Sequence, residues 1–224
     1  MTDDGDERDS DRRPDADLPV VDPPATVDDP VRTGRVAGVL LAAGTSSRFG
    51  EANKLLARVD GDPIVRRAGR TLAGADVSPL LAVVGHEAER VREALSGLGY
   101  RIVENPAYAR GQATSVRAGI GALDGVDAVV LALGDMPFVD PATIDALVRT
   151  YRAGTWTALA AACRGRRGNP VLFDATHFDA LTDVEGDVGG RAILLDGDAS
   201  ALVETGDPGV LRDVDTRGDL DEAQ

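Results

Sequence analysis

The chain has 224 residues, a formal net charge of −14 at pH 7 and a pI near 4.5. This charge excludes nucleic acid and anionic membranes as expected partners, because their phosphate groups would be repelled. At 43% hydrophobic residues the chain can bury a sizeable core, although aromatic residues make up only 4%. The lone cysteine, Cys163, excludes an internal disulfide. Since no apolar run is long enough to span a bilayer, we expect a soluble, cytoplasmic protein.

Arginine almost completely replaces lysine in this chain. Of the 24 basic residues, 23 are arginines, and Lys54 is the one lysine. An acidic chain with this bias indicates a cytoplasm of high salt, where ions screen the repulsion among surface carboxylates. We therefore predict that the midpoint of thermal unfolding rises as KCl increases from low to molar concentration. A flat or falling series of melting curves would contradict this halophilic interpretation.

Residues 1–34 differ in composition from the rest of the chain. Asp, Pro and Arg dominate this segment, and few apolar side chains are present to be buried. Such a composition is typical of disorder. We expect a disordered acidic tail over residues 1–34, followed by one domain over residues 35–224. Deletion of a tail of this kind should leave activity and melting temperature nearly unchanged.

Strands and helices are predicted to alternate along the domain. Short apolar runs that end at glycine or proline predict strands, and apolar residues three or four positions apart predict helices. The predicted strands are 36–43, 79–84, 100–104, 127–133, 157–163, 171–173, 201–204 and 210–214. The predicted helices are 64–72, 86–98, 113–123, 141–152, 192–195 and a last one from about 216. This alternation predicts an α/β fold with a mostly parallel sheet, covered by helices on both faces.

A loop of small residues follows the first predicted strand. Residues 44–50 are GTSSRFG, and small residues let backbone N–H groups converge on an anion. Arg48 within this loop and Lys54 shortly after it add two cations. The loop therefore predicts a polyphosphate site, although the P-loop and dinucleotide-binding patterns are both absent. On composition alone, an ordinary surface turn is an equally good interpretation.

Acidic residues follow two other predicted strands. Asp135 follows the most apolar of these strands after one glycine, and Asp213 and Asp215 lie at and just after the end of the last one. Hard cations such as Mg²⁺ prefer one or two carboxylates together with phosphate oxygens. Because alternate residues of a strand face opposite ways, only one of Asp213 and Asp215 is expected to point into the site. A turn-capping role is the alternative for Asp135, and an N-cap role is the alternative for Ser115.

Six blocks of sequence, taken in order, resemble one known family. They are LAAGTSSRFGEANK, ENP with GQATSVRAGI, LGDMPFV, RGNPVLF, GDVGGRAIL and DVDTRGDL. This series resembles the MobA-like nucleotidyltransferases, and within them the molybdenum cofactor cytidylyltransferases. It covers about residues 35–220. The resemblance implies a three-layer αβα Rossmann-like fold of the GT-A-like kind. It also implies transfer of CMP from CTP to the phosphate of molybdopterin, with release of pyrophosphate.

The resemblance implies roles for particular residues as well. Asp135 and Asp215 would hold Mg²⁺, and Arg48, Lys54 and Asp135 would be catalytic. Alanine at position 43, in place of a second glycine, goes with cytidine rather than guanosine. The implied nucleotide contacts are Leu41, Ala42, Ala43, Gly44, Ser46, Arg48, Lys54, Gly111, Ser115 and Gly134. The implied acceptor contacts are Gly168, Asn169, Pro170, Gly189 and Arg191.

The substrates implied by the resemblance are CTP, or another NTP, and a phosphorylated pterin. A molybdoenzyme or its insertion chaperone is the implied receiving protein. This sequence departs from the family at Arg217, where proline is usual, and at Gly190, where alanine is common. The alternatives are guanylyl transfer, nucleotidyl transfer to another phosphorylated acceptor such as a sugar phosphate, and a non-catalytic cofactor-binding chaperone. His177 matches no motif and is not assigned to the site.

Overall fold

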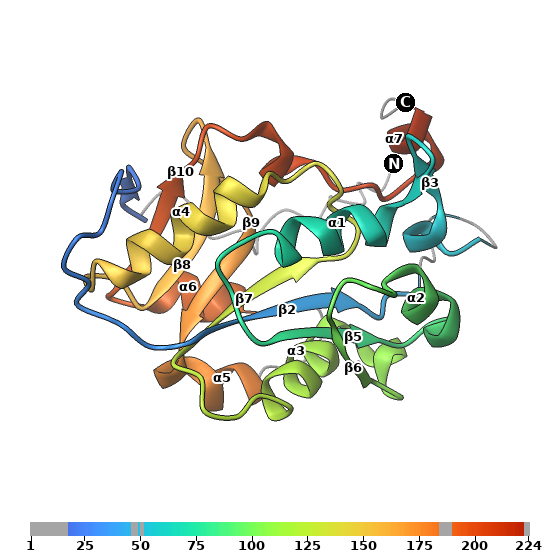
Figure 1. Ribbon diagram of the computed structural model, residues 1–224, viewed down its shortest axis with the longest axis horizontal. Helices are drawn as coiled ribbons and strands as arrows, with labels where there is room; N and C mark the ends of the chain where they lie inside the picture. The colour runs from blue at the N-terminus through green and yellow to red at the C-terminus, as the bar shows by residue number, and fades with distance from the viewer. Residues whose placement is uncertain (1–17, 46–48, 50–51, 184–189, 222–224) are drawn as a thin grey trace, which may run out of the picture.

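Eight strands form one sheet in the computed structural model, which describes residues 18–45, 49, 52–183 and 190–221. These strands are β1 (Val20–Val21), β2 (Val36–Ala42), β5 (Leu80–Val84), β6 (Arg101–Glu104), β7 (Ala128–Leu133), β8 (Ala158–Cys163), β9 (Arg166–Asp174) and β10 (Ser200–Glu204). Their order across the sheet is β1-β10-β8-β9-β7-β2-β5-β6 (Figure 1). Within this sheet β9 runs antiparallel to β7 and β8, and the remaining neighbours pair in parallel. The predicted mostly parallel sheet is therefore confirmed.

Helices cover both faces of the sheet because its central strands are apolar on both sides. All seven residues of β2 are buried, and alternate residues belong to two separate hydrophobic clusters. One cluster includes α1 (Ile64–Ala73), α2 (Ala88–Ala94) and α4 (Pro141–Arg152), and α1 and α4 lie in front of the sheet in Figure 1. The other cluster includes α3 (Gln112–Gly121), α5 (Phe178–Asp183) and α6 (Arg191–Asp196). The three-layer αβα arrangement follows from these two layers of helices.

Shorter elements complete the described chain. A two-stranded antiparallel ribbon joins β3 (Arg58–Val59) to β4 (Asp62–Pro63), and α7 (Arg217–Asp221) lies near the C-terminus. The 3₁₀ helices are η2 (Lys54–Leu56), η3 (Tyr108–Arg110), η4 (Ala175–His177) and η5 (Pro208–Leu211). The sequence patterns did not predict the ribbon, α5, β1 or the 3₁₀ helices, because each is too short to show a period of its own.

Three predicted elements differ from the structure. Residues 210–214 are not a strand, since η5 begins where Asp207 accepts a hydrogen bond from the backbone N–H of Gly209 at 2.7 Å. β9 begins at Arg166 rather than at 171, because its polar first half pairs with the end of β8. α2 ends at Ala94, earlier than predicted, and a turn with Gly97 at a φ of 78° follows it.

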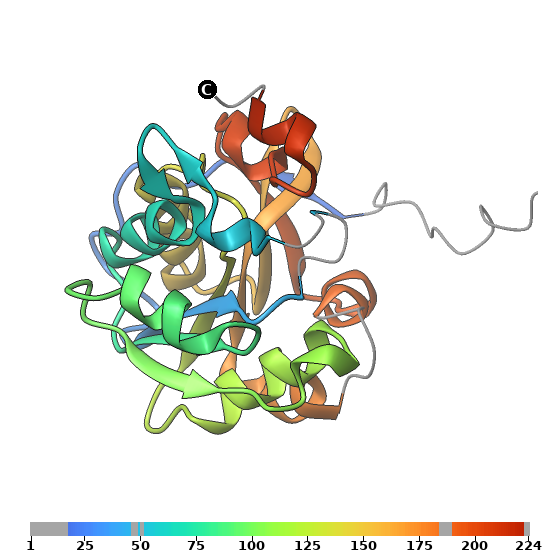
Figure 2. The ribbon, with the colours of Figure 1, turned by 90° about the vertical axis from the view of Figure 1, so that its right-hand side faces the viewer.

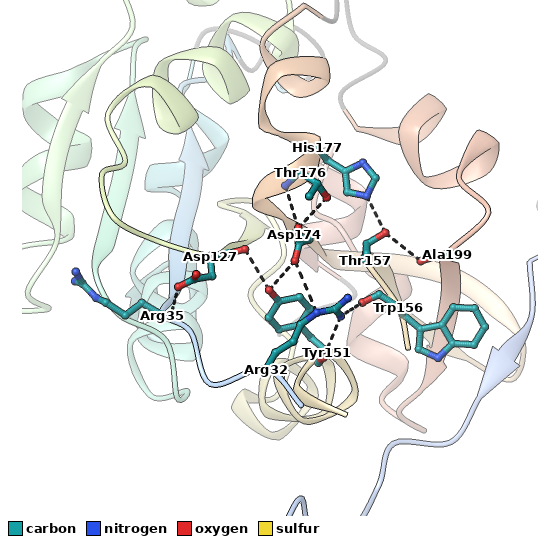
Figure 3. Close-up of polar contacts among 10 residues, drawn as sticks. All are labelled: Arg32, Arg35, Asp127, Tyr151, Trp156, Thr157, Asp174, Thr176, His177 and Ala199. Atoms are coloured by element: carbon teal, nitrogen blue, oxygen red, sulfur yellow. Dashed lines mark hydrogen bonds and ion pairs between the residues drawn. The ribbon is translucent and has the colours of Figure 1, made fainter. Parts of the chain in front are cut away.

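Residues 18–34 lie against the domain, so the prediction of a disordered tail is wrong for this part of the chain. β1 pairs with β10, where the backbone N–H of Leu202 donates to the carbonyl oxygen of Pro19 at 2.9 Å. The guanidinium of Arg32 donates to the carbonyl oxygens of Tyr151 and Trp156 and lies 4.8 Å from the centre of the Tyr151 ring (Figure 3). Its Nε lies 3.9 Å from a carboxylate oxygen of Asp174. Most of these partners are backbone groups far along the chain, which composition cannot reveal.

Residues 18–34 should contribute to the stability of the domain, because they are hydrogen-bonded to it. A chain that starts at residue 35 should melt roughly 5–10 °C lower than the full chain. The reason is that a few hydrogen bonds of about 1 kcal/mol each are lost, and 1 kcal/mol corresponds to roughly 2–4 °C at this size. A chain that starts at Leu18 is the matched control and should melt like the full chain. Equal melting temperatures for both truncations, measured by circular dichroism, would contradict the stabilising role of residues 18–34.

His177, which was not assigned to the site, lies in the same polar region. Its Nε2 is 2.9 Å from the Thr157 hydroxyl oxygen (Figure 3). Its ring forms a T-shaped pair with the ring of Phe173, with the ring centres 6.1 Å apart. This region lies at the amino ends of the parallel strands, where Asp127 precedes β7 and Arg35 precedes β2.

The carboxyl ends of β2, β5 and β7 lie together at the opposite edge of the sheet, which faces the viewer in Figure 2. Ligands of open α/β sheets bind at this edge, in the crevice outside the strands. No helix in the described part of the chain is long and apolar enough to cross a bilayer.

Candidate functional site

A cleft of about 700 Å³ opens at the carboxyl edge of the sheet. It brings together the three segments that the sequence predicted to converge: the loop after β2, the residue after β7 and the start of α3. Among the residues assigned to nucleotide or metal, the following line this cleft: Leu41, Ala43, Gly44, Lys54, Gly111, Ser115, Asp135 and Asp215.

Lys54 lies between the two carboxylates assigned to the metal. Its Nζ is 2.7 Å from Oδ2 of Asp135 and 2.6 Å from Oδ1 of Asp215. Only 13% of the Lys54 side chain is exposed, so solvent screens these charges weakly. Burial by itself would lower the pKa of Lys54, but the charges and hydrogen bonds of Asp135 and Asp215 outweigh it and raise the pKa above its ordinary value. The lysine is therefore an ammonium that balances two negative charges.

Asn53 and Leu55 hold Lys54 in this position. The side-chain oxygen of Asn53 accepts a hydrogen bond from the backbone N–H of Leu55 at 3.0 Å, which caps η2 at its start. Asn53 is 4% exposed and Leu55 is 3% exposed. Lys54 therefore projects from a short helix that is anchored on both sides by buried side chains. Neither anchor was singled out from the sequence, although Asn before a short apolar pair is a helix-start signal.

Asp135 and Asp215 fit a divalent cation. Oδ1 of Asp135 is buried and has no hydrogen-bond partner within the described residues, and an unpaired buried carboxylate oxygen is costly unless a cation is bound there. The described residues contain no cluster of three or more His, Cys, Asp or Glu suited to a metal ion. Mg²⁺ requires no such cluster, because it is held by one or two carboxylates plus substrate phosphates and water.

Asp213 and Asp215 both line the cleft, contrary to the prediction that only one would do so. The alternation rule fails here because residues 212–216 form no strand. Desolvation raises the pKa of Asp213, and the negative charges of Asp215 and Asp135 raise it further, against the lowering effects of its backbone hydrogen bond and of Lys54. Three carboxylates thus face the cleft near one lysine.

Another part of the cleft wall is built by η3 and the first turns of α3. Gly111 joins them with a φ of 108°, a conformation that favours glycine. Ser115 lies within α3 and is 5% exposed, and the N-cap position belongs to Gly111. The N-cap alternative for Ser115 is therefore excluded.

Two residues assigned to the acceptor, Asn169 and Arg191, line a second cavity of about 170 Å³. This cavity shares Leu41, Gln112 and Leu133 with the cleft, so the two spaces adjoin. Arg167 contributes a second guanidinium to it. Its other lining residues are mostly apolar: Val116, Leu131, Val171 and Leu194.

Four assigned residues lie in the fold beside these spaces rather than on their walls. Ala42 is 1% exposed and belongs to the core on the α1 side. Gly134 lets its own backbone pack closely against the end of β2, since a Cβ there would lie 3.1 Å from the Leu41 carbonyl oxygen. A Cβ on Gly168 would lie 2.1 Å from the Val210 carbonyl oxygen. Pro170 follows a cis peptide bond and lines neither the cleft nor the second cavity.

Ser46, Arg48 and Gly189 fall outside the described residues, so their assignments remain predictions. Several cleft residues were missed because no motif contains them or because neighbouring motif residues drew the assignment. They are Thr45, Leu55, Tyr108, Ala109, Arg110, Gln112 and Leu133. Their common signal is position, since each lies at or just after the carboxyl end of a strand or in the first turn of a helix.

Comparison with known proteins places this site in a family. The model described as the MobA-like NTP transferase domain matches residues 38–201. A protein named nicotine blue oxidoreductase, from Paenarthrobacter nicotinovorans, is 31% identical over 188 residues, which cover 81% of this chain and 92% of that protein. A probable molybdenum cofactor guanylyltransferase from Natronomonas pharaonis is 32% identical over 122 residues, 51% of this chain and 56% of that protein.

Solved structures share the fold over most of the chain. A structure described as a nucleotidyl transferase from Methanothermobacter has a TM-score of 0.71 at 25% identity. The match covers 84% of this chain and 95% of that chain. A complex of Rv0371C from Mycobacterium tuberculosis with manganese has a TM-score of 0.68 at 26% identity, covering 84% and 97%. These likenesses confirm the predicted α/β nucleotidyltransferase fold.

Proposed function

We propose, from the premise that this chain belongs to the MobA-like NTP transferase domain family, that it transfers CMP from CTP to the phosphate of molybdopterin. Family membership supports nucleotidyl transfer as the reaction. The choice of CTP and of a pterin acceptor is the proposed part. The observation that carries the proposal is the position of Lys54 between Asp135 and Asp215 inside the cleft.

The proposed reaction is a direct displacement at phosphorus. An oxygen of the acceptor phosphate attacks the α-phosphorus of CTP, the bond from that phosphorus to the bridging oxygen breaks, and pyrophosphate leaves with the electron pair. The attacking oxygen is already anionic, so no general base is needed. The protein therefore contributes positioning and charge stabilisation.

Four charged side chains have a part in this scheme: Arg48, Lys54, Asp135 and Asp215. Asp135 and Asp215 are suited to hold Mg²⁺, which would neutralise negative charge on the α-phosphate when bound. Lys54 releases these carboxylates as the nucleotide enters and donates to its β- and γ-phosphates, because phosphates and carboxylates compete for the same ammonium. Arg48 and backbone N–H groups at Gly44 are proposed to bind the same leaving phosphates.

The choice of cytidine rests on the base side of the cleft. Ala43 and Ser115 both line it, and the Ala42-Ala43-Gly44 form of the loop is the one that resembles cytidylyltransferases. The choice of a pterin rests on the second cavity. Its apolar wall suits a flat ring, and Arg167 and Arg191 suit an anionic group on that ring. Asn169 is proposed to contact the same acceptor, and a molybdoenzyme or its insertion chaperone is the proposed recipient of the product.

A nucleotide panel tests the proposal. Purified protein, Mg²⁺ and molybdopterin are incubated with CTP, GTP, ATP or UTP in turn, and pyrophosphate release is measured with and without the acceptor. We expect release with CTP that depends on molybdopterin. Preference for GTP would replace the proposal with guanylyl transfer. Release that depends on a sugar phosphate instead would overturn the pterin assignment.

The relative named nicotine blue oxidoreductase supports a second candidate, a reductase of an aromatic pigment, because its identity extends over 92% of that protein. The same preparation distinguishes the two. Oxidation of NADH or NADPH by a quinone-like dye, without pyrophosphate release from any nucleotide, would favour the reductase.

A further inference from the structure

A buried asparagine lies behind the base side of the cleft. Asn105 follows β6, is 4% exposed, and donates its backbone N–H to the Val84 carbonyl oxygen at 2.8 Å. Its side-chain oxygen accepts from the backbone N–H of Ala107 at 3.0 Å. A backbone N–H can only donate, so this bond decides which end of the amide is oxygen and which is nitrogen.

The amide nitrogen of Asn105 therefore faces two hydroxyl groups. It donates to Oγ1 of Thr114 at 2.9 Å and to Oγ of Ser115 at 3.0 Å. Since an amide NH₂ has two hydrogens, both are used, and each hydroxyl acts toward Asn105 as an acceptor.

The hydroxyl groups of Thr114 and Ser115 differ in where they can donate their protons. Thr114 donates to the carbonyl oxygen of Gly111 at 2.8 Å, with that of Ala107 at 3.2 Å. For Ser115, Asn105 is the hydrogen-bond partner found among the described residues, and it is a donor. Ser115 lines the cleft, whereas Thr114 is not among the residues that do. The proton of Ser115 is therefore the one left to meet a ligand.

We propose that Asn105 is a positioning residue for base recognition: it makes the Ser115 hydroxyl a hydrogen-bond donor toward the cleft, which selects a nucleobase with an acceptor atom at that point. This inference rests on the proposed binding of a nucleotide base beside Ser115. A base that presents an N–H there would leave two donors facing each other, and a buried donor without an acceptor is costly. Cytosine and uracil both offer O2 as an acceptor, but N3 is an acceptor in cytosine and carries a proton in uracil, so a donor that meets N3 separates these two bases.

The direct test is Asn105→Asp. Aspartate has nearly the same size and keeps an oxygen for the Ala107 N–H, but its carboxylate accepts from Thr114 and Ser115 instead of donating to them. The Ser115 proton then turns away from the cleft. Dissociation constants for CTP, UTP, GTP and ATP are measured by titration calorimetry without acceptor. We expect the ratio of the largest to the smallest of these four dissociation constants to shrink by at least about 10-fold.

Two further variants make the test specific. Ser115→Ala should shrink the ratio to a similar extent, and adding Asn105→Asp to it should change the ratio no further, because both act through one hydroxyl. Thr114→Val removes the other hydroxyl partner of Asn105 and should leave the ratio unchanged. Ser115→Ala also keeps the proposal testable if Asn105→Asp does not fold, since alanine is well tolerated in a helix.

Other outcomes separate this inference from the proposed function. A wild type that prefers GTP, combined with a ratio that collapses in Asn105→Asp and in Ser115→Ala, would remove the cytidine proposal and support the role of Asn105. A ratio unchanged in Ser115→Ala, or changed equally in Thr114→Val, would overturn the inference. Turnover at saturating nucleotide should change much less than KM, which a loss of folding would not produce.

Discussion

Replacing Asp135 with asparagine should lower kcat by at least about 100-fold, a loss of ~3 kcal/mol in transition-state stabilisation. The amide has nearly the volume of the carboxylate but no charge, so it neither attracts a divalent cation nor balances the Lys54 ammonium at 2.7 Å. Oδ1 of Asp135 has no hydrogen-bond partner among the described residues, so the change breaks no bond at that atom. Lys54 also keeps Asp215 at 2.6 Å, and the melting temperature should change little.

The measurement is steady-state pyrophosphate release at saturating Mg²⁺, together with a thermal melt. Asp213→Asn is the matched control. Asp213 lines the same cleft, whereas the two carboxylates in ion pairs with Lys54 are Asp135 and Asp215. We expect a much smaller loss for this control. Near-normal turnover of Asp135→Asn would remove Asp135 from the metal role, and equal losses in both variants would reduce its role to the general negative charge of the cleft.

Replacing Lys54 with arginine should abolish most turnover and weaken CTP binding while the protein still folds. One ammonium nitrogen contacts two carboxylates, and 13% of the Lys54 side chain is exposed. A planar guanidinium is larger and prefers a two-pronged contact with one carboxylate or phosphate, so it fits this space poorly. We expect kcat/KM to fall by roughly 100-fold, in the range seen when a charge-stabilising group is displaced.

Two comparisons isolate the shape of the cation at position 54. Lys54→Met removes the charge, so similar losses in Lys54→Arg and Lys54→Met would show that a positive charge of the wrong shape is of no use. Arg58→Lys changes an exposed cation four residues away, next to η2, and should be silent. Wild-type kinetics for Lys54→Arg would end the proposed phosphate role and leave the one lysine of the chain as a coincidence.

Much of the site could be predicted because its parts are local in sequence. The strand before Gly44 and the strand before Asp135 are short apolar runs that end at glycine, and such runs end at the carboxyl edge of a parallel sheet. That rule alone places the loop after β2, Asp135 and the start of α3 on one side of the molecule. The prediction for Asp213 was wrong because it assumed a strand where Pro208 and Asp207 instead begin a 3₁₀ helix.

By itself, then, the sequence determined the α/β class, the positions of most central strands and helices, and the presence of a cationic loop near carboxylates, because each depends on periodicity or on neighbouring residues. Only the tertiary structure decided that Lys54 bridges Asp135 and Asp215, which are 81 and 161 residues away along the chain. It also decided that Arg32 donates to the backbone carbonyl oxygens of Tyr151 in α4 and of Trp156 before β8, and that the Asn105 amide donates to Ser115. Contacts of this kind join segments that only packing brings together, and no local pattern encodes which donor will meet which acceptor.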